Sequence, residues 1–318
     1  MSETVIHLVT IFGVLAALLT LAAGLIWAER RLLALWQERL GPNRVGPMGL
    51  LQPLADIIKI FLKEDWVPPL ADKPVFVIAP AVVIVAALMS FAVVPFAPGI
   101  EIADMNIGLL FFLAMSSMAV YGVALGGWSS NNKYSLLGSM RAVGQMVSYE
   151  VFMGLALMGV VVQAGSFSLR DIVEAQDGLW FCVPQFVGFV VFAIAGLAET
   201  RRIPFDLPEA DNELVAGYHT EYSGMKFAMF FMGEYVGITL ISALIVALFF
   251  GGWKGPLLPP LVWFILKTLA FIGLFILVRA AMPRPRYDQL TALGWKLMLP
   301  LALANLVVTG AVVLAWER

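Results

Sequence analysis

Long stretches without any charged side chain dominate the pattern of hydrophobic and polar positions along the chain. A hydrocarbon layer about 30 Å thick needs roughly 20 apolar residues per helix. Five windows of about that length or more hold no Asp, Glu, Lys or Arg, and three others hold a single one each: Glu150, Glu234 and Lys267. The pattern predicts eight membrane-spanning helices, at about 4–28, 74–98, 106–127, 142–164, 180–198, 227–250, 257–279 and 297–316.

The positive charges between these segments are distributed unevenly. Sixteen of the 20 Lys and Arg residues lie in the first, third, fifth and seventh loops or at the helix ends that flank them, whereas the other loops hold only Arg170 and Lys254. Cytoplasmic loops of membrane proteins are rich in Lys and Arg. The asymmetry supports eight spans and predicts that both termini lie on the outer, periplasmic side.

Composition indicates the same class of protein. Hydrophobic residues make up 61% and charged residues 13% of the 318 residues, and the mean hydropathy is +0.89. Soluble domains carry about 25% charged residues. So little charge cannot cover a water-soluble globule, which excludes an ordinary soluble enzyme. We therefore expect an all-α integral membrane protein with a single polytopic domain over residues 1–318.

The chain carries few of the side chains that hold cofactors. Its one cysteine, Cys182, excludes a cysteine-ligated iron–sulfur cluster, and His7 and His219 are too few for a His-rich metal site. No glycine-rich nucleotide loop is present. A net charge of −2 without any basic run gives no indication of a nucleic-acid partner. We expect this chain to bind no cofactor and no metal.

The first inner loop, expected over 29–73, contains a segment with helical spacing of apolar residues. Gly49 precedes this segment, and Pro68 and Pro69 follow it. The pattern predicts an amphipathic helix that lies either on the inner membrane surface or against a partner subunit. Its apolar face would consist of Leu50, Leu54, Ile57, Ile58 and Phe61.

The segment 199–221 is unusually acidic for so apolar a chain. A helix beginning near Pro208 would place Glu209 and Glu213 on one face, where like charges repel. A helix dipole on a solvated loop accounts for Asp206 and Glu209 but not for Glu213 and Glu221. The six carboxylates in these 23 residues are Glu199, Asp206, Glu209, Asp211, Glu213 and Glu221.

Two further acids, Glu150 and Glu234, fall inside predicted spans. A charge at the centre of a membrane helix costs roughly 2.5–3.5 kcal/mol, so such residues usually face a polar interior and belong to an ion or proton pathway. The alternative is a structural ion pair with Lys267 or with an inner-side arginine such as Arg279. A balanced cluster of this kind can take up or release protons when a nearby charge changes.

Four segments together resemble one known family, the membrane-embedded H subunit of proton-pumping NADH:quinone oxidoreductase, respiratory complex I. The first runs from Glu29-Arg30-Arg31 through GPNRVG at 41–46, and the second is GWSSNNKY at 127–134. The third is RIPFDLPEADNEL at 202–214, continuing to EYSG at 221–224, and the fourth is Arg279 with PRPRYDQL at 283–290. One departure is Asp211, where the family more often carries Glu, so that the charge has a shorter reach.

The resemblance implies a respiratory-chain translocase subunit with eight helices, at the joint between a membrane arm and a hydrophilic arm. Such a subunit forms much of the channel by which its substrate, ubiquinone or a related quinone, approaches an iron–sulfur cluster of neighbouring soluble subunits. NADH, FMN and the iron–sulfur clusters then belong to partner subunits, and the partners are the other membrane and hydrophilic subunits, quinone and the lipid bilayer. The implied location is the bacterial inner (plasma) membrane, or the mitochondrial inner membrane for an organellar chain.

The resemblance also implies roles for individual residues. It assigns the coupling of quinone chemistry to proton translocation to a carboxylate route made of Glu150, Asp206, Glu209, Asp211, Glu213, Glu221 and Glu234. The candidates for the quinone channel are Glu29, Arg30, Phe205, Arg279 and Arg284. Its three arginines would balance those acids or steer the quinone headgroup. Simple anchoring by positive charge on the inner side is the competing explanation for the arginines.

Other classes of protein remain open on the sequence. A stand-alone cation/proton antiporter would also need buried carboxylates and a buried Lys267. A structural anchor for a soluble enzyme would leave the acids in the spans unexplained. A membrane-bound hydrogenase contains a related anchor protein in which no quinone channel need operate, but the long first loop and the full acidic motif favour complex I.

Overall fold

The computed structural model describes residues 3–316, in which the elements are all helices and no strand is named. The all-α membrane class expected from the sequence is confirmed. The longer helices are α1 (Glu3–Trp36), α3 (Lys73–Ser90), α4 (Gly108–Ser129), α5 (Lys133–Ala164), α7 (Phe186–Glu199), α9 (Gly224–Phe249), α10 (Pro260–Ala281) and α12 (Leu299–Trp316). The shorter helices are α2 (Gln52–Leu62), α6 (Leu169–Glu174), α8 (Asp211–Leu214) and α11 (Tyr287–Leu293).

Seven helical stretches in the described part of the chain are long and apolar enough to cross a membrane, and α7 is a shorter apolar helix. The fifth expected span, 180–198, is therefore helical only from Phe186. Residues 181–185 form turns in which the Cys182 N–H donates to the Phe249 carbonyl at 2.8 Å. Non-helical backbone is tolerated at membrane depth where protein groups satisfy it, so the apolar run continues although the helix does not.

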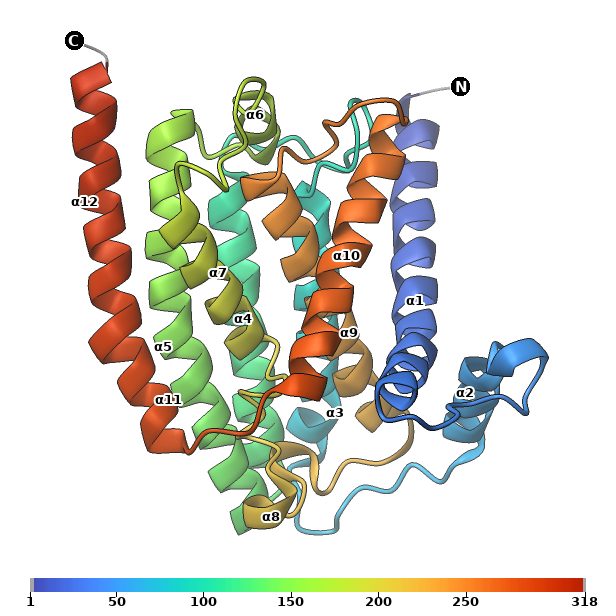
Figure 1. Ribbon diagram of the computed structural model, residues 1–318. Coiled ribbons are helices and arrows are strands. Elements are labelled where there is room, and N and C mark those ends of the chain that lie inside the picture. The colour runs from blue at the N-terminus through green and yellow to red at the C-terminus, as the bar shows by residue number, and fades with distance from the viewer. Residues whose placement is uncertain (1–2, 317–318) are drawn as a thin grey trace.

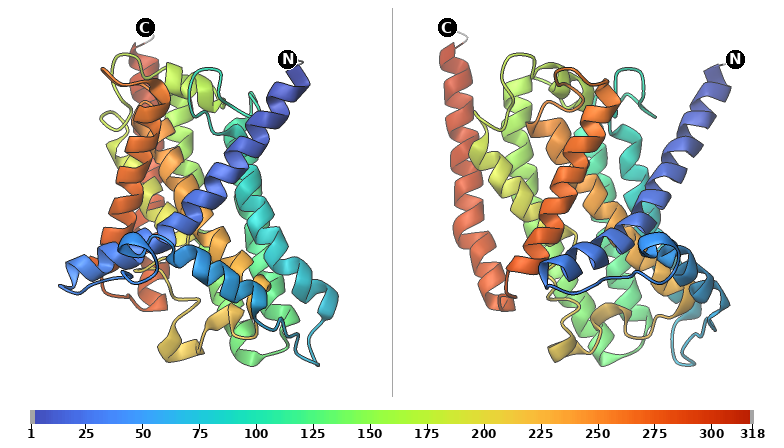
Figure 2. Two further views of the ribbon diagram at one scale, coloured as in Figure 1. Left: turned by 90° about the vertical axis from the view of Figure 1, so that its right-hand side faces the viewer. Right: turned by 45° about the vertical axis from the view of Figure 1, so that its right-hand side comes forward.

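Helix α1 is longer than the charge-free window predicts. Its 34 residues continue through Glu29 and Arg30 to Trp36, whereas the sequence suggested that a loop begins at Glu29. At 1.5 Å per residue such a helix measures about 50 Å, more than the hydrocarbon thickness, and tilts to fit. Figure 2 shows this tilt of α1 against the other long helices.

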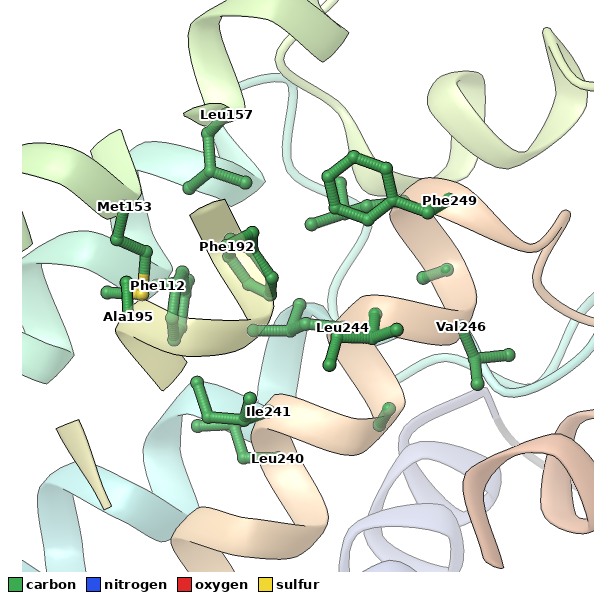
Figure 3. Packing of buried hydrophobic residues seen from close by; sticks show 14 of the residues in the cluster. Phe112, Met153, Leu157, Phe192, Ala195, Leu240, Ile241, Leu244, Val246 and Phe249 are labelled. Atoms are coloured by element: carbon green, nitrogen blue, oxygen red, sulfur yellow. The ribbon is translucent and has the colours of Figure 1, made fainter. Parts of the chain in front are cut away.

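Helix α9 occupies the centre of the bundle and contacts α1, α2, α3, α6, α7 and α10. Its stretch from Leu244 to Phe249 is fully buried, because neighbours cover it on every side. Figure 3 shows Phe192 of α7 beside this stretch, within a cluster that also includes Met153 and Leu157 of α5 and Phe112 of α4. This packing makes α9 a rigid support for the groups at its other end.

The helices place the loops rich in Lys and Arg together. Figure 1 shows α2, α8 and α11 at one end of the bundle, here called the basic end, while α6 and the outer ends of α1 and α12 lie at the opposite end. The loop 200–223, here called the acidic loop, also lies at the basic end, between α7 and α9. Acidic and basic side chains from distant parts of the chain therefore meet there.

The expected amphipathic helix is present as α2. Its apolar side chains are exposed, among them Ile58 at 59% and Phe61 at 65%. Asp56 on the other face receives a hydrogen bond from Arg30 of α1 at 2.9 Å. The turn before α2 requires glycine at Gly49, where φ is +76° and an added Cβ would lie 2.2 Å from the Pro42 carbonyl oxygen.

Candidate functional site

The acidic loop is held in place by neutral contacts. The side-chain amide of Gln145, on α5, donates to the carbonyls of Ala198 and Phe205, each at 2.8 Å. Phe205 is buried, with its ring centroid 5.9 Å from that of Tyr149. Gly217 has φ +60° and lies so close to another part of the loop that a Cβ would approach a backbone carbonyl oxygen to 1.8 Å. The charged side chains therefore project from a fixed backbone.

Four charged side chains from separate segments form an ion network in which three of the four are shielded from solvent. Arg202 of the acidic loop donates through Nη1 to both oxygens of Glu29 on α1, at 2.6 and 2.8 Å. Its Nε pairs with Glu234 of α9, and Arg279 of α10 also pairs with Glu29. The side chains of Glu29, Arg202 and Glu234 are 3%, 7% and 12% exposed. The two buried acids are thus balanced by buried Arg202 and by Arg279, whose side chain is 36% exposed, as buried charges require.

Arg202 is the central cation of the network. Its guanidinium lies 4.4 Å from the ring centroid of Tyr235, a favourable cation–π position. Burial alone would lower the pKa of Arg202, but the carboxylates of Glu234 and Glu29 raise it above its ordinary value. Arg202 therefore keeps its charge and fixes the two carboxylates in position.

A first cavity of about 130 Å³ lies beside the network. One water occupies about 30 Å³ of liquid volume, so the space suits several waters or a small polar group. Cations, acids and aromatic rings share its wall, which can therefore contact both the polar and the apolar parts of a ligand. The lining includes Arg201, Arg202, Asp206, Glu209, Tyr218, His219, Phe227, Phe231, Glu234 and Arg279.

Two acids of the acidic loop line this cavity. Asp206 accepts a hydrogen bond from Arg284 at 2.5 Å, and Glu209 accepts one from the Tyr218 hydroxyl at 2.9 Å. Burial raises the pKa of Asp206 to about 6, and the charge of Glu209 adds to the rise, while Arg284 opposes it. Asp206 therefore titrates close to neutral pH.

A second cavity, of about 60 Å³, leads from the network toward a pair of carboxyls on α5 and α7. Ser116 Oγ, on α4, lies 3.0 Å from an oxygen of Glu150 and 3.0 Å from one of Glu199. Ser117 Oγ lies 3.2 Å from both oxygens of Glu150. A hydroxyl carries one proton. Both Ser116 bonds can form together only if one carboxyl is protonated and donates, so the three groups make a proton-sharing unit.

Other candidate acids lie apart from the two cavities. Glu213 is 55% exposed and pairs with Arg141 at 2.5 Å, and Glu221 accepts a hydrogen bond from Asn132 at 2.6 Å. The expected helix from Pro208 is wrong, because α8 begins only at Asp211 and Glu209 turns toward Tyr218 instead of sharing a face with Glu213. The side chain of Asp211 falls outside the described residues.

The structure also shows which of the expected basic partners, Lys267 and Arg279, contact Glu150 and Glu234. Lys267 contacts neither Glu150 nor Glu234; its ammonium donates to the carbonyls of Phe250, Gly252 and Lys254, which follow α9 at the opposite end. The inner-side arginine that pairs with Glu234 is Arg202, not Arg279.

Among the described residues no group of three or more His, Cys, Asp and Glu could hold a metal ion.

The sequence did not identify every residue of the site. Of the expected residues, the structure gathers Glu29, Asp206, Glu209, Glu234, Arg279 and Arg284 around the network and first cavity, and places Glu150 against Ser116, which lines the second cavity. It adds Arg202, Glu199 and Ser116, which were not among the candidates. Signals existed for Glu199, which belongs to the acidic segment 199–221, and for Arg202, since two buried acids require a nearby cation.

The class of protein is thus a polytopic α-helical membrane protein with a charge network and a first cavity at its basic end, and a second cavity that shares Arg201 and Glu234 with the first. The family model described as NADH dehydrogenase matches residues 9–310. The H subunit of NADH-quinone oxidoreductase from Methylococcus capsulatus (strain ATCC 33009 / NCIMB 11132 / Bath) is 66% identical over 303 residues, which cover 95% of this chain and 96% of that protein. The chain belongs to the NADH dehydrogenase family, which confirms the resemblance of the four segments.

Proposed function

We propose that this chain is the membrane-embedded H subunit of a proton-translocating NADH:quinone oxidoreductase. In this role it forms much of the quinone channel and couples quinone reduction to proton translocation. NADH, FMN and iron–sulfur clusters belong to the partner subunits, and quinone is the substrate. The observation that carries the proposal is the network of Glu29, Arg202 and Glu234, which are shielded from solvent, with the partly exposed Arg279, together with the family membership.

The quinone channel is supported by the mixed wall of the first cavity. Phe227 and Phe231 offer apolar contacts to a ring, and Arg202 and Arg279 offer donors to its carbonyl oxygens. Arg30 ties α1 to the amphipathic helix α2 through Asp56, which fixes the proposed entrance. Arg284 acts through Asp206, and Phe205 acts by holding the loop.

Proton coupling follows from the charge that quinone reduction creates. A quinone takes up two electrons and two protons to become a quinol. Negative charge that develops in the first cavity attracts protons from nearby carboxyls and changes the balance between Glu234 and Arg202. Glu234 also lines the second cavity, so the change reaches the unit of Ser116, Glu150 and Glu199. We assign to Glu209, Asp211, Glu213 and Glu221 the supply of protons at the basic end.

The same account fixes an orientation in the membrane. We place the chain in the bacterial inner membrane with the basic end in the cytoplasm and both termini in the periplasm. The support is the excess of Lys and Arg at that end and the location of the outer ends of α1 and α12 at the other (Figure 1).

Purification tests this proposal against the other classes. The full chain carrying an affinity tag is isolated from gently solubilised membranes of its own cell. We expect it to bring along membrane and hydrophilic partners that oxidise NADH and reduce quinone. Recovery as a homo-oligomer that exchanges cations in proteoliposomes would make it an antiporter, and recovery with hydrogenase activity would make it a hydrogenase anchor; either result would contradict the proposal.

A further inference from the structure

Arg201 is a buried cation to which the account above gives no role. The residue is 5% exposed, and its Nε and Nη1 atoms make no hydrogen bond. Its guanidinium lies 5.0 Å from the ring centroid of Tyr218. Arg202, its neighbour, holds the ion pairs to Glu29 and Glu234. A buried guanidinium without a matching acid in contact is costly, so its place in the fold needs an explanation.

The position of Arg201 gives that explanation. Among the residues that the structure describes, only Arg201 and Glu234 line both cavities. The first cavity holds Asp206 and Glu209, and the second holds Glu199, whose Oε2 atom is buried without a hydrogen-bond partner. A proton that moves from one cavity to the other passes this junction.

A fixed positive charge at the junction controls the form in which a proton can cross. In a buried, weakly polar site, a guanidinium strongly repels a hydronium ion. Arginines that line pores exclude protons and cations in the same way. A carboxyl group is neutral while it carries its proton and is not repelled. Glu234, once protonated, therefore gives up its proton and becomes a carboxylate, which the two arginines stabilise. The carboxylate of Glu199 binds that proton and becomes a neutral carboxyl.

We propose that Arg201 is a positioning residue for proton transfer, whose fixed charge at the junction blocks free hydronium and confines transfer between the cavities to the Glu234 carboxyl. The inference rests on the proposed function, because it presumes that protons move through this protein during quinone reduction. It goes further by naming the residue that prevents those protons from leaking.

The test compares variants of the whole assembled complex in liposomes. Arg201→Met removes the charge at similar length, and Arg201→Lys keeps it. Arg286→Met is the matched control, because the Arg286 side chain is 81% exposed and lies outside both cavities. Quinone reduction and proton translocation are recorded together, so that the readout is protons moved per electron, which a loss of folded complex does not change. Arg201→Gln replaces the methionine variant should that variant fail to assemble.

We expect Arg201→Met to translocate at least twofold fewer protons per electron, whatever its rate of quinone reduction, and to dissipate an imposed pH gradient faster. Arg201→Lys and Arg286→Met should keep the wild-type ratio. An unchanged ratio in the neutral variants, or an equal loss in Arg201→Lys, would overturn the inference. A wild-type complex that reduces no quinone or moves no protons would instead overturn the proposed function itself.

Discussion

Removal of the Arg202 guanidinium tests whether the buried ion network holds the basic end together. Arg202→Met keeps much of the side-chain volume but leaves Glu234 without its ion-pair partner, while Glu29 retains Arg279. The three side chains are shielded from solvent, since Glu29, Arg202 and Glu234 are 3%, 7% and 12% exposed. Breaking a buried pair by removing one partner costs about 3–5 kcal/mol. We expect a loss of that size in the free energy of unfolding.

A double-mutant cycle separates this cost from general damage. Glu234→Gln in the Arg202→Met background removes the charge that was left unpaired, so the double variant should recover part of the lost stability. The deviation from additivity should be about 1–3 kcal/mol. The free energies come from denaturant titration of the purified chain in mixed micelles, followed by tryptophan fluorescence. Arg286→Met, at an exposed position, is the control. A loss below about 1 kcal/mol, or strict additivity of the two substitutions, would refute the reasoning.

Three further predictions concern the two cavities and the loop between them. Ser116→Ala removes the hydroxyl that links two carboxyls, and should lower the rate of proton-coupled quinone reduction at least threefold in the assembled complex. Ser117→Ala removes contacts to one carboxyl only and should lower this rate less. Equal losses of rate in the two variants would contradict the proton-sharing unit. Because the pKa of Asp206 is raised from 3.8 to about 6, the folded state favours its protonated form. Wild type should therefore lose about 2–3 kcal/mol relative to Asp206→Asn as the pH rises from about 4 to about 6, and a stability difference that stays constant across this range would contradict the assignment. Gly217→Ala should destabilise the acidic loop by about 1–3 kcal/mol, because φ is +60° and the added methyl meets a carbonyl oxygen. A variant that unfolds at the same temperature as wild type would rule this out.

The sequence predicted the long helices well, since a membrane helix leaves a run of about 20 apolar residues that needs no knowledge of its neighbours. It also predicted α2, because apolar spacing on one face is a local property. It misjudged the end of α1, because the charges of Glu29 and Arg30 resemble the start of a loop. Glu29 remains inside the helix only because Arg202 and Arg279, 173 and 250 residues away, neutralise it.

The candidate site was predictable in composition but not in geometry. The acids were visible as a cluster along the chain, yet turns in the acidic loop send Glu209 toward the first cavity and Glu213 toward the surface. Arg202 was counted with the positive charges of the inner side, because a sequence does not show which arginine is buried. Ser116 lies beside Ser117 on a largely apolar helix, and its role depends on two carboxyls that α5 and α7 bring together.

Photo-crosslinking with an azido-quinone tests the central claim, that this chain forms the wall of a quinone channel at its basic end. Membranes that contain the assembled complex are labelled with and without a channel inhibitor as competitor, and the labelled peptides are mapped. The account predicts inhibitor-sensitive labelling within residues 29–63 or 202–234, which include Arg30, Arg202 and Glu234. Absence of label from this chain while NADH:quinone activity persists would place the quinone site in the partner subunits and contradict the claim.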